Sequence, residues 1–145
     1  MIPDESLLRI GLLMIVATGV IQVVAQLVLS WMMDVLPSPS LSRYPRFYML
    51  THSVTAVVIL MAGHILQVTI WAMVYHYHWN EFVNFKSALY FSLANFTTLG
   101  ASDLALPPDH RMIGALEAAA GMLMFGWSTA LLVAVVQRTT HRPPP

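Results

Sequence analysis

The sequence has no cysteine and very little charge. Without cysteine, its 145 residues can form no disulfide, thiolate metal site or cysteine nucleophile. Only 10% of the residues are charged, and the seven basic and seven acidic side chains cancel, whereas soluble domains carry roughly 25% charged residues. No basic stripe is present, so we expect no nucleic-acid partner. Hydrophobic residues make up 57% of the chain, and this composition predicts a membrane protein in contact with lipid.

Three apolar stretches are long enough to cross a hydrocarbon core of about 30 Å as helices. They run from Leu7 to Met33, from Leu50 to Trp79 and from Met112 to Gln137. The second stretch ends among aromatic residues, which are enriched at membrane interfaces. The sequence therefore predicts three transmembrane helices.

Basic residues favour one orientation of these helices. Arg43 and Arg46 follow the first stretch, and Arg138 and Arg142 follow the third. The opposite side carries the other three basic residues, which are Arg9, Lys86 and Arg111. Because basic residues are enriched on the cytoplasmic side, this count favours an external amino terminus and a cytoplasmic carboxyl terminus.

A shorter segment between the second and third stretches cannot cross a membrane alone. Phe82 to Phe96 is amphipathic and apolar, and as a helix it would cover only about half a bilayer. The residues from Thr97 to Pro108 are mostly small, polar or proline, a composition that does not continue a helix. Such backbone is tolerated at membrane depth only inside protein or beside water. We therefore expect an all-α membrane protein with three transmembrane helices and a re-entrant helix and loop between helices two and three.

Residues Ala88 to Ala130 resemble the pore module of the potassium channel family. An aromatic helix leads into Thr98-Leu-Gly-Ala-Ser-Asp103, where that family has Thr-Val-Gly-Tyr-Gly-Asp, and Gly121-Met-Leu-Met-Phe-Gly-Trp-Ser-Thr129 is similar to its inner helix. The resemblance implies three parts. These are a first transmembrane helix with its cytoplasmic connection (1–49), a pore module of outer helix, pore helix, filter and inner helix (50–138), and a short tail (139–145).

The resemblance also implies how the chain works. In the family, backbone carbonyls of four filter loops replace the hydration shell of K⁺, so one loop per chain implies a homotetramer and a passive pore for K⁺ or Na⁺. It implies no cofactor, and a place in the bacterial inner (plasma) membrane. By this resemblance, Tyr90 of the pore helix braces the filter, whose residues are Thr97, Thr98, Leu99, Gly100, Ala101, Ser102 and Asp103.

The candidate filter departs from the family at two positions. Ala101 replaces the family's tyrosine, and Ser102 replaces its second glycine, where left-handed backbone costs a non-glycine residue about 1 to 2 kcal/mol. One interpretation retains the inner sites at Thr98, Leu99 and Gly100 and gives a monovalent cation channel with poor K⁺ preference. Two others stay open. The loop could find another brace and select K⁺, or it could collapse and leave a non-conducting, channel-like scaffold.

Glu117 is the one acidic residue of the third stretch. It lies about two turns inside, and an ionisable group at depth suggests a functional site, here one that senses external protons. The alternative places it near the outer interface, paired with Arg111 or His110.

Small and cavity-facing residues follow on the same stretch. Gly114, Ala118 and Gly121 form a face that lets another helix approach closely, and the resemblance adds a gating hinge at Gly121. The resemblance also implies that the water-filled cavity or gate is lined by Met122, Phe125 and Thr129.

The histidines suggest a competing function, a metal or haem site in a membrane protein. His52, His64 and His76 are each twelve residues apart, which turns a helix by about 120° beyond whole turns, so their rings point in three directions. We therefore expect no such site on one helix face. The sequence also shows no nucleophile beside a base and no nucleotide-binding loop, so we expect no enzyme.

Overall fold

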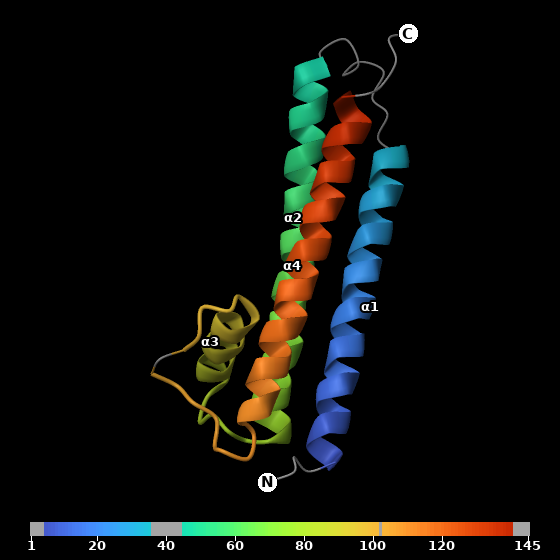
Figure 1. The fold of residues 1–145 in the computed structure, drawn as a ribbon. Helices are drawn as coiled ribbons and strands as arrows, with labels where there is room; N and C mark the ends of the chain where they lie inside the picture. The colour runs from blue at the N-terminus through green and yellow to red at the C-terminus, as the bar shows by residue number, and fades with distance from the viewer. Residues whose placement is uncertain (1–4, 36–44, 102, 141–145) are drawn as a thin grey trace.

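The computed structural model describes residues 5–35, 45–101 and 103–140 (Figure 1). Three long helices, α1 (Glu5–Val35), α2 (Pro45–Met73) and α4 (Arg111–Thr140), lie along one another. Helix α2 continues into a π-helical segment, η2 (Val74–His78), and the short helix α3 (Phe85–Phe96) precedes α4. The described ranges contain no β-strand. The expected all-α class, with three helices long enough to span a membrane and a shorter one before the third, is confirmed.

Each long helix begins before the apolar stretch that predicted it. Helix α1 encloses the expected span from Leu7, and α4 encloses the expected span from Met112. Helix α2 begins at Pro45 rather than Leu50. Proline fits the first turn of a helix because its missing N–H would have no partner there anyway. The helices thus start in residues that precede the apolar runs. Apolarity alone therefore places the start of each helix too late.

The outer faces of the long helices are apolar. In their most apolar windows only 28%, 39% and 28% of the residues are buried. Large side chains such as Leu13, Val58 and Leu123 are exposed on these faces. A continuous apolar surface of this size suits lipid rather than water. The chain is therefore an integral membrane protein.

Helix α3 is a half-length helix beside one end of the bundle. The side chain of Asn84 caps its first turn by accepting a hydrogen bond from the Ser87 backbone N–H at 2.8 Å. Its 12 residues cover about 18 Å, too little to cross a bilayer. The segment between η2 and α4, which contains α3, starts and finishes at the end of the bundle where α2 ends and α4 begins (Figure 1). The segment is therefore re-entrant, as the sequence predicted.

An aromatic cluster holds α3 against α2 and η2. Tyr75 is fully buried and meets Phe91 edge-on, with ring centroids 5.2 Å apart. Phe82 packs on Phe91 with a centroid separation of 5.1 Å, and Trp71 lies one turn before Tyr75, also fully buried. Aromatic pairs at such distances add about 0.5 to 1.5 kcal/mol each beyond their buried area. This packing fixes where α3 ends and where the following loop begins.

Candidate functional site

The end of α3 rests directly on α4 at Gly121. A Cβ atom on Gly121 would lie 2.0 Å from the carbonyl oxygen of Phe96 and 2.8 Å from its carbonyl carbon, so no side chain fits there. Gly114 has no such constraint, because its nearest neighbour would be Asn95 Nδ2 at 3.5 Å. Close helix approach therefore demands glycine at Gly121, in line with the packing role of the small-residue face. The hinge role of Gly121 stays a prediction.

The backbone is left-handed at two positions where the candidate filter begins. The angle φ is 60° at Thr98 and 76° at Gly100. Thr98 N donates to Asn95 O at 2.8 Å, and Gly100 N donates to Ala94 O at 2.9 Å, so the loop is pinned to the last carbonyls of α3. For a β-branched residue such as Thr98, this conformation costs about 1 to 2 kcal/mol. The sequence placed strain at Ser102, which lies outside the described residues, and the structure adds strain at Thr98.

The residues of this turn are exposed in the single chain. Thr97, Thr98, Leu99 and Gly100 are exposed, with Leu99 at 80%. Ala101, which replaces the family's tyrosine, packs instead against the apolar core of the chain. Irregular backbone at membrane depth needs protein or water around it. The exposed face of this loop therefore needs protein or water around it.

One side-chain hydrogen bond ties the far end of the loop to α3. The Tyr90 hydroxyl donates to Asp103 Oδ1 at 3.3 Å, and both side chains are exposed. These are the two residues that the resemblance pairs. A long, exposed bond of this kind contributes about 0.5 to 1.5 kcal/mol at most. The bracing role of Tyr90 stays a prediction.

Glu117 is fully buried where α2, α3 and α4 meet. The Tyr75 hydroxyl donates to Glu117 Oε2 at 2.7 Å, and Ser92 Oγ lies 2.5 Å from Glu117 Oε1. The Ser92 hydroxyl also reaches the carbonyl oxygen of Val68 at 2.8 Å. One carboxyl group thus joins three helical segments through hydrogen bonds.

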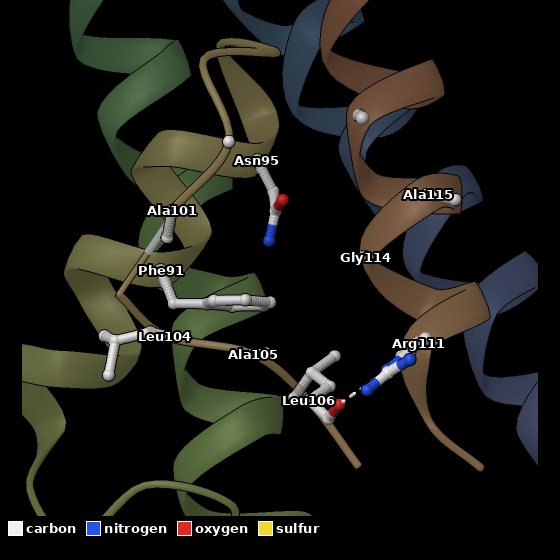
Figure 2. Close-up of a pocket in the computed structure, with 11 residues that line it drawn as sticks. Phe91, Asn95, Ala101, Leu104, Ala105, Leu106, Arg111, Gly114 and Ala115 are labelled. Atoms are coloured by element: carbon white, nitrogen blue, oxygen red, sulfur yellow. Dashed lines mark hydrogen bonds between the residues drawn. The ribbon is translucent and has the colours of Figure 1, made fainter. Parts of the chain in front are cut away.

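The expected pairing of Glu117 with Arg111 or His110 is wrong. Arg111 Nε donates to Leu106 O at 3.2 Å (Figure 2), and His110 contacts Glu81. The reason is helical geometry. Six residues after Arg111, Glu117 lies about 9 Å deeper and about 240° further around α4, so it faces α3 instead of the outer end.

The predicted cavity residues share one face of α4. Met122, Phe125 and Thr129 are all exposed in the single chain. The Thr129 hydroxyl donates to Phe125 O at 2.9 Å, so its own helix satisfies it. On Gly126, a Cβ atom would meet no described atom within 4 Å. This part of α4 is open to water or to another chain, and its role in lining a cavity stays a prediction.

A cavity of about 280 Å³ opens between the loop and α4. Figure 2 shows Phe91 and Asn95 on one side of it and Gly114 and Ala115 on the other. The side-chain nitrogen of Asn95 points into this space and has no hydrogen-bond partner among the described residues. The cavity behind the candidate filter is large enough for an ordered water or a small polar group.

The histidines of α2 and η2 have separate environments. His52 Nδ1 lies 2.9 Å from Tyr48 O, and His76 Nδ1 lies 3.0 Å from Phe82 O. His64 is buried and bonded to other side chains. Within the described ranges, no three His, Cys, Asp or Glu side chains gather where they could hold a metal ion. This geometry gives no support to the competing metal or haem site.

Four buried polar residues in the long helices were not predicted from the sequence. They are Thr18, Gln22, Gln67 and Ser128, none more than 6% exposed. A signal was present on α1, where Thr18, Gln22 and Gln26 recur every four residues within an apolar run. That spacing places them on one helix face, where polar side chains need partners from another helix.

A known protein family matches the part of the chain that contains these features. A family model described as an ion channel matches residues 63–138, more than half of the chain. The match begins within α2, includes α3 and the candidate filter, and leaves α1 outside. No curated protein and no solved structure matches the chain. The chain therefore belongs to this ion channel family, and residues 63–138 carry its two-span, potassium-channel-like pore module.

Proposed function

We propose that four copies of the chain assemble around one axis and pass monovalent cations passively, with K⁺ and Na⁺ as permeant ions. The observation that carries this proposal is the re-entrant loop, whose residues Thr98, Leu99 and Gly100 are exposed in one copy. Four loops around an axis supply what such backbone requires, with neighbouring chains on one side and permeant ions and water on the other. A homotetramer in membrane lipid, closed by rotational symmetry, completes the site.

In this assembly the inner ion sites lie at Thr98, Leu99 and Gly100. Left-handed backbone at Thr98 and Gly100 interrupts the alternation of a regular strand, in which successive groups point to opposite faces. Successive carbonyls can then turn toward the same axis, as ion coordination requires. Ala101 packs inward and supplies no aromatic brace, so the outer half of the filter is wider and K⁺ preference is weak.

Two other outcomes compete with weak selectivity. The Tyr90 to Asp103 hydrogen bond favours a filter that is braced by another route and selects K⁺. A loop that closes on itself in the assembly would instead leave a non-conducting scaffold.

Topology follows from the same proposal. The amino terminus and the filter face outward, and the carboxyl terminus lies in the cytoplasm, consistent with the bacterial inner membrane. Because the chain has no cysteine, Ser6→Cys and Thr140→Cys each introduce a single reactive thiol. An impermeant reagent should label position 6 on intact cells and spare position 140, and the reverse result would point the filter inward.

We also propose that Glu117 carries its proton in the folded chain and acts as the proton-sensitive contact of α3. Ser92 has one hydroxyl hydrogen and two acceptors in reach, Val68 O and Glu117 Oε1. If that hydrogen goes to Val68 O, the Glu117 carboxyl must donate to Ser92. Ionising Glu117 would place an unpaired charge in a buried site and draw the Ser92 hydrogen away from Val68 O, which loosens α3 from α2.

The direct test is cation flux into liposomes that contain the purified protein, with K⁺, Na⁺ and protons compared. We expect both K⁺ and Na⁺ to enter, with K⁺ only modestly faster. Thr98→Pro is the disabled control, because proline cannot adopt positive φ and removes the N–H that bonds Asn95 O. Equal flux in Thr98→Pro and parent liposomes would assign the signal to leakage or a contaminant. A complex whose mass is not that of four chains would contradict the tetramer.

A further inference from the structure

Four polar side chains form a closed hydrogen-bonded ring deep between α1, α2 and α4. Gln22 Nε2 donates to Ser128 Oγ at 2.9 Å, and Ser128 Oγ lies 3.0 Å from His64 Nε2. His64 Nδ1 lies 3.4 Å from Gln67 Oε1, and Gln67 Nε2 donates to Gln22 Oε1 at 3.2 Å. The four residues are between 0% and 6% exposed. We call this set the polar ring.

The polar ring can be satisfied in either direction, and in both directions His64 is neutral. In one direction, Ser128 donates to His64 Nε2 and His64 Nδ1 donates to Gln67 Oε1. If both amides are turned over, every bond reverses, and His64 then donates through Nε2 and accepts through Nδ1. Each member gives one hydrogen and receives one within the ring. A second proton on His64 makes both ring nitrogens donors, so in either arrangement one neighbour must turn its own hydrogen out of the ring.

His64 also contacts the parts of the chain assigned to the pore. Its ring centroid lies 4.7 Å from that of Phe125 and 5.9 Å from that of Phe96. Phe96 is the last residue of α3, directly before the candidate filter, and Phe125 belongs to the open face of α4. The imidazole thus stands between the polar ring and both pore elements.

Helix α1 is bonded to the pore module beyond the polar ring as well. Trp71 Nε1 donates to Thr18 Oγ1 at 3.1 Å, and Trp127 Nε1 donates to Gln26 Oε1 at 3.1 Å. Within an apolar medium such interhelical bonds contribute about 0.6 to 1.7 kcal/mol each. The first helix is therefore a structural partner of α2 and α4, although it lies outside the family match.

We propose that the polar ring is a proton-operated latch through which α1 and α2 hold the half of α4 that follows Gly121. With His64 neutral the ring is closed and Ser128 is held. With His64 protonated both ring nitrogens are donors, so either the Ser128 hydroxyl or the Gln67 amide must turn its hydrogen out of the ring, the ring opens, and α4 is released at Ser128. This inference rests on the proposed function only for its effect on ion flow, since the latch itself is a property of the helix contacts.

Among the described residues that bond to His64, stack on it or complete the polar ring, no other group could set off this change. The side chains that face it are Gln22 from α1, Gln67 from α2, Phe96 from α3, and Phe125 and Ser128 from α4. None of them titrates between pH 5 and 8, where histidine does, and none is an anion that could stabilise imidazolium. A buried charge without a partner is strongly unfavourable. Protonation therefore drives the ring open rather than being absorbed in place.

The test measures the spacing of α1 and α4 directly. Val28→Cys and Val133→Cys place spin labels on exposed positions beyond the polar ring, and labelled chains are diluted among unlabelled ones so that distances within one chain dominate. We expect the α1 to α4 distance distribution to shift or broaden between about pH 8 and about pH 4. His64→Gln, which keeps a donor and an acceptor but cannot titrate, should abolish the shift. His52→Gln, a histidine of the same helix outside the ring, should retain it.

A second variant keeps the test decisive if His64→Gln does not assemble. Ser128→Ala removes the α4 member of the ring, so its spacing at neutral pH should already match that of the acidified parent. The latch is overturned if the parent shows no shift, if His64→Gln shifts like the parent, or if Ser128→Ala matches the neutral parent. Flux is measured on the same samples. A proton-dependent distance without flux would support the latch and contradict conduction, whereas flux without a distance change would do the reverse.

Discussion

Two buried polar clusters hold α4, and they differ in what they join. Near the end of the bundle that carries α3, Glu117 bonds Tyr75 and Ser92 and so ties α4 to the helix that leads into the filter. About 16 Å further along α4, Ser128 bonds His64 and ties α4 to α2 and, through the polar ring, to α1. Neither cluster contains an opposite charge, so ionising Glu117 in one or protonating His64 in the other would place an unpaired charge in a buried site.

The comparison teaches that α4 is held as two halves. One half contacts the helix that leads into the candidate filter, and the proposed latch acts on the other half. Gly121 stands between the two clusters, at the contact with Phe96. Variants that damage one cluster and spare the other therefore test whether the halves are separate.

The largest effect is expected from Gly121→Ala, because Gly121 lies between the two polar clusters of α4. The added Cβ would overlap Phe96 O, so α3 and α4 must move apart. Overpacking of this kind costs about 1 to 3 kcal/mol or more, and because Phe96 leads directly into the filter, flux should be lost. Tryptophan fluorescence during thermal unfolding in detergent, together with liposome flux, measures both consequences.

Gly126→Ala is the matched control for that change. It lies five residues further on α4, and its Cβ would meet nothing within 4 Å in the chain. Alanine in place of an unconstrained helical glycine stabilises by about 0.5 to 1 kcal/mol. If Gly121→Ala behaved like Gly126→Ala, the close contact between α3 and α4 would be wrong.

The next largest effect concerns the Glu117 cluster. Glu117→Ala leaves the Tyr75 and Ser92 hydroxyls without their partner, and an unsatisfied buried polar group costs about 1 to 3 kcal/mol. Glu117→Gln keeps the shape, with an amide that donates to Ser92 and an oxygen that accepts from Tyr75, so its unfolding temperature should stay near that of the parent. Equal damage by both variants would show that the charged carboxylate is required and would contradict the proposed proton on Glu117.

A smaller effect is expected at the polar ring. Gln22→Leu removes the α1 member and should lower the free energy of unfolding by about 0.6 to 1.7 kcal/mol per lost bond. The exposed α1 residue Val24 offers a control in Val24→Leu. The ratio of K⁺ to Na⁺ flux should be unchanged in Gln22→Leu. A change in that ratio as large as in filter variants would mean that the two halves of α4 are not separate.

The smallest effect is expected for Tyr90→Phe. Its hydrogen bond to Asp103 is long and exposed, so its loss should cost about 0.5 kcal/mol. We expect only a slight fall in K⁺ preference by the flux ratio. A large fall would identify the Tyr90 to Asp103 contact as the main brace of the loop.

The sequence predicted the half-length helix at the end of the bundle, but it did not predict the polar contacts between the long helices in the middle. Apolar run length identifies a half-length helix between full spans, and the small residues and prolines after Phe96 end it. These are local properties of the chain. The sequence predicted a small-residue face that includes Gly121. It did not predict that Gly121 lies against Phe96.

The misses concern partners on other helices. Glu117 was placed beside the nearest basic residues in sequence, whereas rotation around α4 directs it to Tyr75 and Ser92. The polar ring joins residues up to 106 positions apart, and nothing in the sequence of one helix specifies which polar residue of another it meets. The left-handed backbone at Thr98 was also missed, because a β-branched residue gives no warning of it.

The reversal potential across a bilayer with K⁺ on one side and Na⁺ on the other tests the central claim most directly. We predict that the parent carries cation current with weak K⁺ preference, and that Ala101→Tyr combined with Ser102→Gly shifts the potential toward that of a K⁺-selective pore. A parent that already excludes Na⁺ as strongly as the double variant would contradict the account of the filter. No current in either protein, at any voltage, pH or lipid composition tried, would contradict the pore itself.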